Sequence, residues 1–326
     1  MPSMKAIKRR RSTVKNISQI TKAMNLVATS KLQRARANLA AVGKPVQATL
    51  EVIYSTISDI DTVAMEAFDR PFILSNSNTA EEKAKNVAYI IITGNRGLCG
   101  GYNSGVCKEL VKHAKANEIK NPLIIPMGTK GRDYFKRRNS NLHEMPAPSE
   151  PPTFEEAKSV ADKVVSMYET QVDGSWMIDE VYLVYTQFRT ILNLEPIVRK
   201  VMPLDPDYLR RVVGTELRDG EEWEDVGFFP RPEVKPTVLH KQEMEYEPGL
   251  EEVLRSAVPW YLCMFIYAAL ASSALCEQAA RMTSMDSATK NAGEIIDKLT
   301  LLFNRQRQSI ITQEITEIVS GANALN

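Results

Sequence analysis

A glycine-rich turn is the first place where the types and spacing of residues could support chemistry. Its glycines are Gly94, Gly97, Gly100 and Gly101, directly after the apolar run VAYIIIT. A dinucleotide-binding turn has the spacing GxGxxG, which lets the backbone approach a pyrophosphate, whereas this turn has the spacing GxxGxxG. The sequence contains neither GxxxxGKS nor GxxxxGKT, the patterns of a phosphate-binding loop. We therefore interpret the turn as a tight strand-to-helix connection, with nucleotide binding as the weaker alternative.

Cysteine and histidine, which often act as nucleophiles and metal ligands, are few and scattered. No CxxC, HExxH or GxSxG pattern occurs, so the sequence predicts no metal site, no bound cofactor and no catalytic centre. Four cysteines are too few for a disulfide framework, and we expect reduced thiols. The residues concerned are Cys99, Cys107, Cys263 and Cys276, together with His113, His143 and His240.

The charges are unevenly distributed along the chain. Residues 1–44 contain 11 Lys and Arg but no Asp or Glu, although the whole chain has 41 basic and 40 acidic residues. Such a segment is typical of proteins that bind an acidic partner, a nucleic acid or a membrane surface. No aromatic residue precedes Tyr54, so stacking on nucleotide bases is not indicated.

Both ends of the chain carry the period of long amphipathic helices. The pattern predicts one helix from Ser3 to Ile60, with a kink or short break at Gly43 and Pro45. It predicts a second helix over residues 250–320. The expected apolar stripe of the first helix begins with Ile7, Val14, Ile17, Ile20, Met24 and Val27. That of the second includes Ala268, Ala271, Leu275, Ala279, Met282, Met285, Ala292, Ile295, Leu299 and Leu302.

The lengths of these two helices favour an antiparallel coiled coil, in which each helix buries the stripe of the other. An ordinary helix bundle is the alternative. The apolar run from Ser256 to Cys276 contains no charged residue over 21 positions, which is long enough for a membrane span. Pro259 and the polar continuation of the same helix argue instead for burial against a partner helix.

The middle of the chain predicts a compact α/β domain with a mostly parallel sheet. The expected strands are Val87–Thr93, Leu123–Met127, Glu180–Phe188 and Ile197–Leu204, and the expected helices are Tyr102–Asn117, Thr129–Arg138 and Phe154–Val172. A connection rich in proline and acidic residues follows over 205–249. The sequence therefore divides into an N-terminal helix (1–60), an α/β domain with the acidic connection (61–249) and a C-terminal helix (250–326).

Three blocks resemble the gamma subunit of F-type ATP synthase in its bacterial-like form. The first is ISQITKAMNLVATSKLQRAR at Ile17–Arg36, and the second is NRGLCGGYN at Asn95–Asn103. The third lies at the end of the chain, where EQAARMTSMDSATKNA is followed by NRQRQSIITQEITEIVSGA. The resemblance covers essentially the whole chain. It implies a long antiparallel coiled coil of the two terminal helices, with a Rossmann-like α/β domain that has no nucleotide site.

The resemblance also implies the function of a rotor subunit in the central stalk. Such a subunit couples rotation of the membrane c-ring, driven by an ion gradient, to conformational change in the catalytic beta subunits. The expected partners are the alpha/beta hexamer, the epsilon subunit and the c-ring, with one copy of the chain per complex. ATP chemistry would take place on beta, so this chain would not be an enzyme. We expect a peripheral protein at the cytoplasmic face of the cell membrane, without a transmembrane span.

Seven residues take a role from this resemblance. It places Met24, Arg307, Gln308, Thr312 and Gln313 at contacts with the catch and collar of beta, the last four on one helix and Met24 on the facing one. It places Tyr246 and Glu247, in the element YEP, near epsilon or the c-ring. Two alternatives stay open at this point: a coiled-coil nucleic-acid-binding protein and a nucleotide-dependent α/β enzyme.

Overall fold

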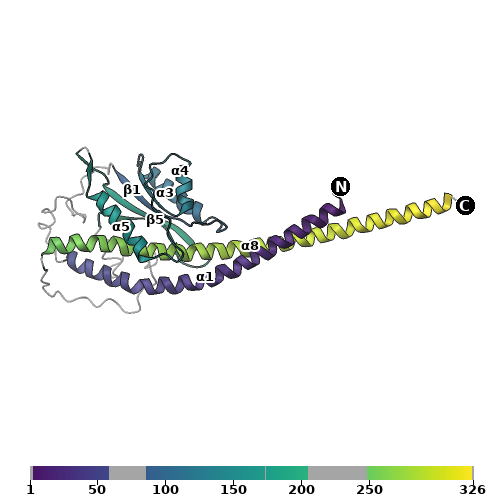
Figure 1. Cartoon of the computed structure of the whole chain (residues 1–326), viewed down its shortest axis with the longest axis horizontal. Helices are drawn as coiled ribbons and strands as arrows, with labels where there is room; N and C mark the ends of the chain where they lie inside the picture. Colours follow the sequence, from purple (N-terminus) through teal and green to yellow (C-terminus); the bar gives the residue numbers. More distant parts are fainter. Residues whose placement is uncertain (1–2, 59–85, 173, 205–246, 248, 325–326) are drawn as a thin grey trace. The chain divides into compact units, whose positions relative to one another are not determined.

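The computed structural model describes residues 3–58, 86–172, 174–204, 247 and 249–324. Two long helices form the ends of this chain, α1 over Met4–Ser58 and α8 over Leu250–Ala324 (Figure 1). The chain divides into two compact units. The paired-helix unit consists of Met1–Ser30 and Arg281–Asn326, and the α/β unit consists of Lys31–Ala280. Each long helix contributes residues to both units.

The sequence predicted a kink or a short break at Gly43 and Pro45; helix α1 continues through both residues, so there is no break. A proline inside a helix removes one backbone hydrogen bond and crowds the preceding turn, which usually ends the helix. Here Val42 and Val46 flank the proline on the inner face of the helix, and both are buried in the core of the α/β unit. Their packing maintains the helix across this position.

A four-stranded sheet lies in the α/β unit, and its strands follow the order β2, β1, β5, β6. Strand β1 pairs in parallel with β2 and β5, whereas β6 pairs with β5 in the antiparallel sense. The strands are β1 (Val87–Ile92), β2 (Leu123–Met127), β5 (Glu180–Phe188) and β6 (Leu194–Met202). The prediction of a mostly parallel sheet is confirmed, and β6 is its antiparallel edge strand.

The two faces of the sheet pack into two different cores because successive residues of a strand point to opposite sides. Ala88, Ile90 and Ile92 of β1 pack in the core that includes residues of α5 (Phe154–Tyr168) and α8. Tyr89 and Ile91 pack in the core that includes residues of α3 (Tyr102–Ala116). A short helix, α4 (Thr129–Lys136), follows β2.

One predicted helix is too long. The sequence predicted a helix over Phe154–Val172, but α5 ends at Tyr168, and Gln171–Val172 form strand β3 instead. Strand β3 pairs with β4 (Ser175–Trp176) in a tight antiparallel hairpin. Gly174 in this turn has a φ of 77°, a conformation that glycine adopts without strain. The helix ends before Val172 because Gln171 and Val172 pair with β4 in this hairpin.

The apolar run of α8 is long enough to cross a membrane, as the sequence suggested. By length and composition the stretch Arg255–Gly321 passes such a test, and 72% of its most apolar window is buried inside the protein. Tyr261, Phe265 and Ile266 are fully buried in the core that this helix shares with the sheet and α5. Burial in the protein accounts for the apolar character of this segment. The four cysteines are also buried, and none of them forms a disulfide.

Candidate partner-binding surface

The seam of the paired-helix unit has the seven-residue period of a coiled coil. Apart from Arg281, which lies four residues before Met285, the buried residues of both helices are separated by seven or fourteen positions: Ile7, Thr21 and Ala28 on α1, and Met285, Ala292 and Leu299 on α8. A period of seven keeps one stripe of each helix facing its partner as the two helices wind around each other. The described part of this unit is therefore a two-helix coiled coil.

Polar contacts fix the register of the two helices. The hydroxyl oxygens of Thr21 and Thr289 lie 2.8 Å apart, and Asn25 Nδ2 donates a hydrogen bond of 3.0 Å to the carbonyl oxygen of Met282. Further along, the Arg11 guanidinium lies 5.3 Å from the centre of the Phe303 ring. Partners on α8 move backward as the residue number on α1 rises, so the helices are antiparallel. The predicted coiled coil is confirmed.

The predicted apolar stripes are wrong at several positions. Ile17, Ile20 and Val27 were expected in the seam, but their side chains are 48%, 58% and 57% exposed. On α8, Ile295 and Leu302 are likewise exposed. Small or polar residues such as Thr21 and Ala28 take several of the seam positions in their place. Sequence reasoning missed them because it followed the largest apolar side chains and not the strict period of seven.

Large apolar side chains are thus exposed along both helices of this unit. They are Ile17, Ile20, Leu26 and Val27 on α1, and Ile295, Leu301, Leu302, Ile311, Ile315, Ile318 and Val319 on α8. We call this set the outer apolar surface. Exposed apolar surface on this scale marks a site of interaction with another molecule. Exposed basic side chains accompany it on α1, at Lys5, Lys8, Arg9, Arg10, Lys15 and Lys22.

The predicted contact residues lie in different parts of this unit. Met24 is half-buried beside the seam, whereas Arg307, Gln308, Thr312 and Gln313 are exposed on α8. Since Asn25 faces Met282, Met24 lies at the level of the 282–289 stretch. Arg307 follows Thr289 by eighteen residues, roughly 27 Å along the helix axis. The structure therefore brings the four residues of α8 together and places Met24 apart from them.

The remaining predicted contact residues are Tyr246 and Glu247. Glu247 is exposed. Tyr246 lies outside the described residues. No group of three or more His, Cys, Asp and Glu side chains that could hold a metal ion occurs within the part of the chain that the structure describes.

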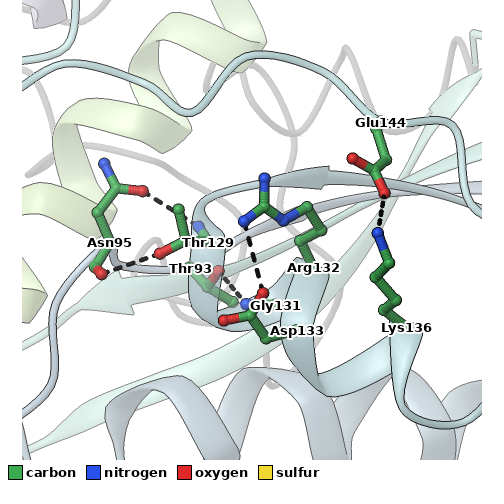
Figure 2. A network of polar contacts seen from close by, with 8 residues as sticks. All are labelled: Thr93, Asn95, Thr129, Gly131, Arg132, Asp133, Lys136 and Glu144. Atoms are coloured by element: carbon green, nitrogen blue, oxygen red, sulfur yellow. Dashed lines mark hydrogen bonds and ion pairs between the residues drawn. The ribbon is translucent and has the colours of Figure 1, made fainter.

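The glycine-rich turn lies at the carboxyl end of β1, where a Rossmann-like fold commonly binds a ligand. Figure 2 shows how side chains of this region bond to the first turn of α4. Asn95 Oδ1 accepts a hydrogen bond of 3.1 Å from the backbone N–H of Thr129, and Thr93 Oγ1 accepts one of 2.8 Å from Gly131. Side chains of this connection thus form hydrogen bonds within the chain that tie the end of β1 to the start of α4, which supports the interpretation of a structural connection.

The same turn also packs against α8. A Cβ atom added to Gly94 would lie only 2.8 Å from the carboxylate of Glu277, so the absence of a side chain at Gly94 leaves room for this carboxylate. The Gly94 N–H donates to Asn103 Oδ1 at 2.8 Å, which holds the turn onto α3. Burial, with a further contribution from Glu277, raises the pKa of Tyr102 well above its usual value. Two of the sequence blocks that carry the family resemblance are thus in direct contact within the α/β unit.

An aromatic cluster with one histidine lies on the α3 side of the sheet. Tyr89 is fully buried, and its hydroxyl lies 2.8 Å from Nδ1 of His113. The His113 ring lies 4.8 Å from the ring of Tyr182. Burial lowers the pKa of His113, although Glu109 and Glu180 counteract part of this effect. Burial and then Glu180 raise the pKa of Tyr89, so its hydroxyl keeps its proton and shares a hydrogen bond with Nδ1 of the imidazole.

This cluster predicts that acid destabilises the α/β unit. In the unfolded chain His113 has a pKa of about 6.5. The folded chain has a lower pKa, so the unfolded chain binds more protons as pH falls below that value, and stability decreases. The charged groups that face the ring are Glu109 and Glu180, and Glu180 also pairs with Lys200. Both carboxylates favour the protonated imidazole, so they reduce this loss of stability. Between pH 7 and pH 5 we expect the free energy of unfolding, measured by chemical denaturation, to decrease less for His113→Gln than for the wild type.

A second histidine provides the control for this experiment. Burial and Lys163 lower the pKa of His143, so it contributes to acid destabilisation in the same direction. That contribution is the same in the wild type and in His113→Gln, and it cancels in the comparison. His143→Gln should remove only the contribution of His143 to the acid destabilisation. Equal pH dependence of the wild type and His113→Gln would contradict the assignment to His113.

The fold and the surface together define a class of protein that combines a Rossmann-like α/β unit with a two-helix coiled coil. The coiled coil exposes large apolar side chains. A family model described as ATP synthase matches residues 3–325. The ATP synthase gamma chain of Ruminiclostridium cellulolyticum is 36% identical over 327 residues, which cover 99% of each chain. The gamma chain of Alkaliphilus metalliredigens is 37% identical over 99% of this chain and 98% of its own. This chain belongs to the ATP synthase gamma chain family.

Solved structures show the same fold. A chain of the Euglena gracilis mitochondrial ATP synthase, in its OSCP/F1/c-ring structure, superposes with a TM-score of 0.63 at 18% identity, over 99% of this chain and 94% of that one. A chain of the Tetrahymena thermophila mitochondrial ATP synthase, from the structure of its central stalk and c-ring, superposes with a TM-score of 0.53 at 23% identity. This match covers 82% of this chain and 99% of that chain.

Proposed function

We propose that this chain is the rotor subunit of the central stalk of an F-type ATP synthase. The observation that supports it most directly is the outer apolar surface, on a coiled coil that belongs to a gamma chain along its whole length. A coiled coil that serves only as a support would bury its isoleucines and leave polar side chains outside. In this one the small or polar residues Thr21, Ala28 and Ala292 occupy half of the buried seam positions named above, while many large apolar side chains face outward, where a surrounding partner could cover them.

The mechanism follows from the asymmetry of a single coiled coil. One copy inside a hexamer of alternating alpha and beta subunits cannot present the same face to three identical catalytic subunits. It therefore stabilises a different conformation in each of them, and its rotation exchanges those conformations in turn. Rotation of the c-ring, driven by an ion gradient, would couple in this way to ATP synthesis, and hydrolysis would drive the reverse rotation. The chain itself would not be an enzyme and would need no cofactor.

Two kinds of contact with the hexamer are assigned to α8. Arg307 and Gln308 carry side-chain N–H donors for acidic loops of beta, and Thr312 and Gln313 continue this polar surface. Gln313 Nε2 donates to Glu317 Oε1 at 3.0 Å, which orients its amide. Ile311, Ile315 and Ile318 give the end of the helix an apolar face that can slide within a collar. Met24 would contact beta at a separate level, on α1.

The base of the chain would connect to the membrane sector. We assign Tyr246 and Glu247 to contacts with epsilon or the c-ring, and we keep the division into 1–60, 61–249 and 250–326 as the functional one. The protein would be peripheral, at the cytoplasmic face of the cell membrane, with no span of its own. The comparisons give no support to a coiled-coil nucleic-acid-binding protein, and we do not propose one.

Reconstitution with alpha and beta subunits tests this function. We expect this chain to stimulate ATP hydrolysis and a bead fixed to its base to rotate in steps. Hydrogen bonds to a charged group contribute about 1.5–3 kcal/mol, so Arg307→Ala should reduce the rate of hydrolysis by about tenfold or more. Gln308→Ala should have a smaller effect in the same direction.

Arg305 offers a matched control for Arg307. It is an exposed arginine on the same helix, but two residues of an α-helix separate the side chains by about 200° around the axis. Arg305→Ala should therefore leave hydrolysis and rotation near the wild-type level. Failure of the chain to assemble with alpha and beta, or to change their hydrolysis rate, would rule out the rotor function.

A further inference from the structure

A cavity of about 270 Å³ lies in the α/β unit, at a place to which the proposed function assigns no role. Three segments line it: the stretch of α1 from Lys31 to Asn38, the loop residues 150–152, and the stretch of α8 from Ala271 to Gln278. All three belong to one compact unit, so the cavity has defined walls. Small-molecule sites commonly have volumes of about 300–1,000 Å³, and this cavity is near the lower end of that range.

The walls combine an apolar lining with a few charged groups, as ligand sites do. Ala35 and Ala274 contribute methyl groups from the two helices, and Pro151 and Pro152 form a rigid third wall. The charged groups are two cations on α1 and two carboxylates opposite them. Small side chains on two helices leave space in which a flat ring can lie.

The charges of the lining indicate which ligand it can bind. Glu150 pairs with Lys31 at 2.9 Å, and the carboxylate of Glu277 is buried against Gly94. Arg34 also lines the cavity, and its guanidinium has no ion-pair or hydrogen-bond partner among the described residues. The charge in this cavity that is left for a ligand is therefore positive. A guanidinium binds a carboxylate through two parallel hydrogen bonds.

We propose that this cavity binds a small organic carboxylate with a single flat apolar ring. The carboxylate would bind Arg34 and lie near Lys31, whose ion pair with Glu150 is partly exposed and can rearrange at little cost. The ring would lie between Ala35, Ala274 and the two prolines. A bound ligand would then contact α1, α8 and the loop at once and hold these three segments together.

The site is tested by titration of the full chain with 4-fluorobenzoate, observed by fluorine NMR. We expect saturable binding at millimolar or lower concentration. 4-Fluorobenzylamine, which has a similar shape and the opposite charge, should bind at least about tenfold more weakly because it lacks the acceptor for Arg34. Arg34→Gln should weaken the binding of 4-fluorobenzoate by about tenfold or more. Ala274→Leu should abolish it, because the larger side chain fills the cavity.

Arg36 supplies the matched control. It is an exposed arginine two residues beyond Arg34 on the same helix and does not line the cavity, so Arg36→Gln should bind as the wild type does. Arg34 is exposed, and its replacement leaves the core intact even if Ala274→Leu fails to fold. No saturable binding by the wild type, equal binding by Arg34→Gln, or equal binding of the amine would overturn the proposal. Because the titration needs no other subunit, its result is independent of the rotor function.

Discussion

Replacement of Gly128 by alanine is expected to lower the free energy of unfolding of the α/β unit by about 4 kcal/mol or more, a loss at the upper end of what single substitutions cause. Gly128 lies between β2 and α4 with a φ of 121°, a backbone conformation that side chains with a Cβ rarely adopt. An added Cβ would lie 2.1 Å from the carbonyl oxygen of Thr93. That oxygen is part of the backbone, which cannot rotate away as a side chain could.

The strain at residue 128 would also affect neighbouring elements, because Thr93 is bonded to residues on both sides of Gly128. The Thr93 N–H donates to the carbonyl oxygen of Met127 at 2.8 Å, next to Gly128, and its hydroxyl accepts from Gly131 at 2.8 Å. Moving Thr93 to make room would therefore break the end of the β1–β2 pairing and the start of α4 together. This is the region that Figure 2 shows as a network of polar contacts.

Urea denaturation of the full chain, followed by near-ultraviolet circular dichroism, measures this effect. Gly97→Ala is the control, since a Cβ there would meet nothing within 4 Å and the φ of Gly97 is not in the positive region. We expect Gly97→Ala to change stability by less than about 1 kcal/mol. A Gly128→Ala protein as stable as the Gly97→Ala protein would contradict the geometry of this connection.

Phe265→Ala is expected to cost about 3–5 kcal/mol, the range for removing a buried aromatic ring. Phe265 is 0% exposed, and its ring lies 5.0 Å from that of Tyr261 within the core of the α/β unit. The substitution removes the transfer free energy of the ring and leaves a cavity in a core that is held from three sides, by the sheet, α5 and α1. The fixed surroundings can collapse only partly into this space.

Trp260 supplies the contrast, because it lies five residues earlier in the same apolar run but is 46% exposed. Its ring touches Phe154 at a centroid distance of 5.4 Å, so Trp260→Ala should cost only about 1 kcal/mol. The same denaturation experiment measures both variants. If this run of α8 faced lipid instead, Phe265→Ala would cost no more than Trp260→Ala.

The strands and the long helices were predictable because each follows from a local pattern. Runs such as VAYIII are buried on both faces of the sheet, and their composition alone indicates a strand. The antiparallel edge strand could have been predicted as well. Only five residues separate β5 from β6, too few for the crossover that a parallel pair requires. The end of α5 was missed because the tight hairpin after it depends on Gly174.

The candidate surface was harder to predict, because it depends on which face of each helix the partner covers. Hydrophobicity alone cannot distinguish an isoleucine in a seam from one reserved for another protein, and Ile17 and Ile20 were assigned to the wrong face for this reason. Thr21 and Asn25 could have been found only by testing a strict period of seven. The separation of Met24 from Arg307 needs the register of the two helices, which the contact between Thr21 and Thr289 sets.

Helix α8 continues beyond the first turn of α1, and this overhang has a consequence for order in the isolated chain. Arg11 faces Phe303, so Met4 lies near position 310, and every residue of 311–321 is exposed. A lone helix of this length is marginal in water, because few of its hydrogen bonds are protected by packing. The backbone amides of this end should exchange with solvent quickly in the free chain and slowly in the proposed complex, where a collar would enclose it. The order of this end of α8 would then come from the subunits that surround it and not from the chain itself.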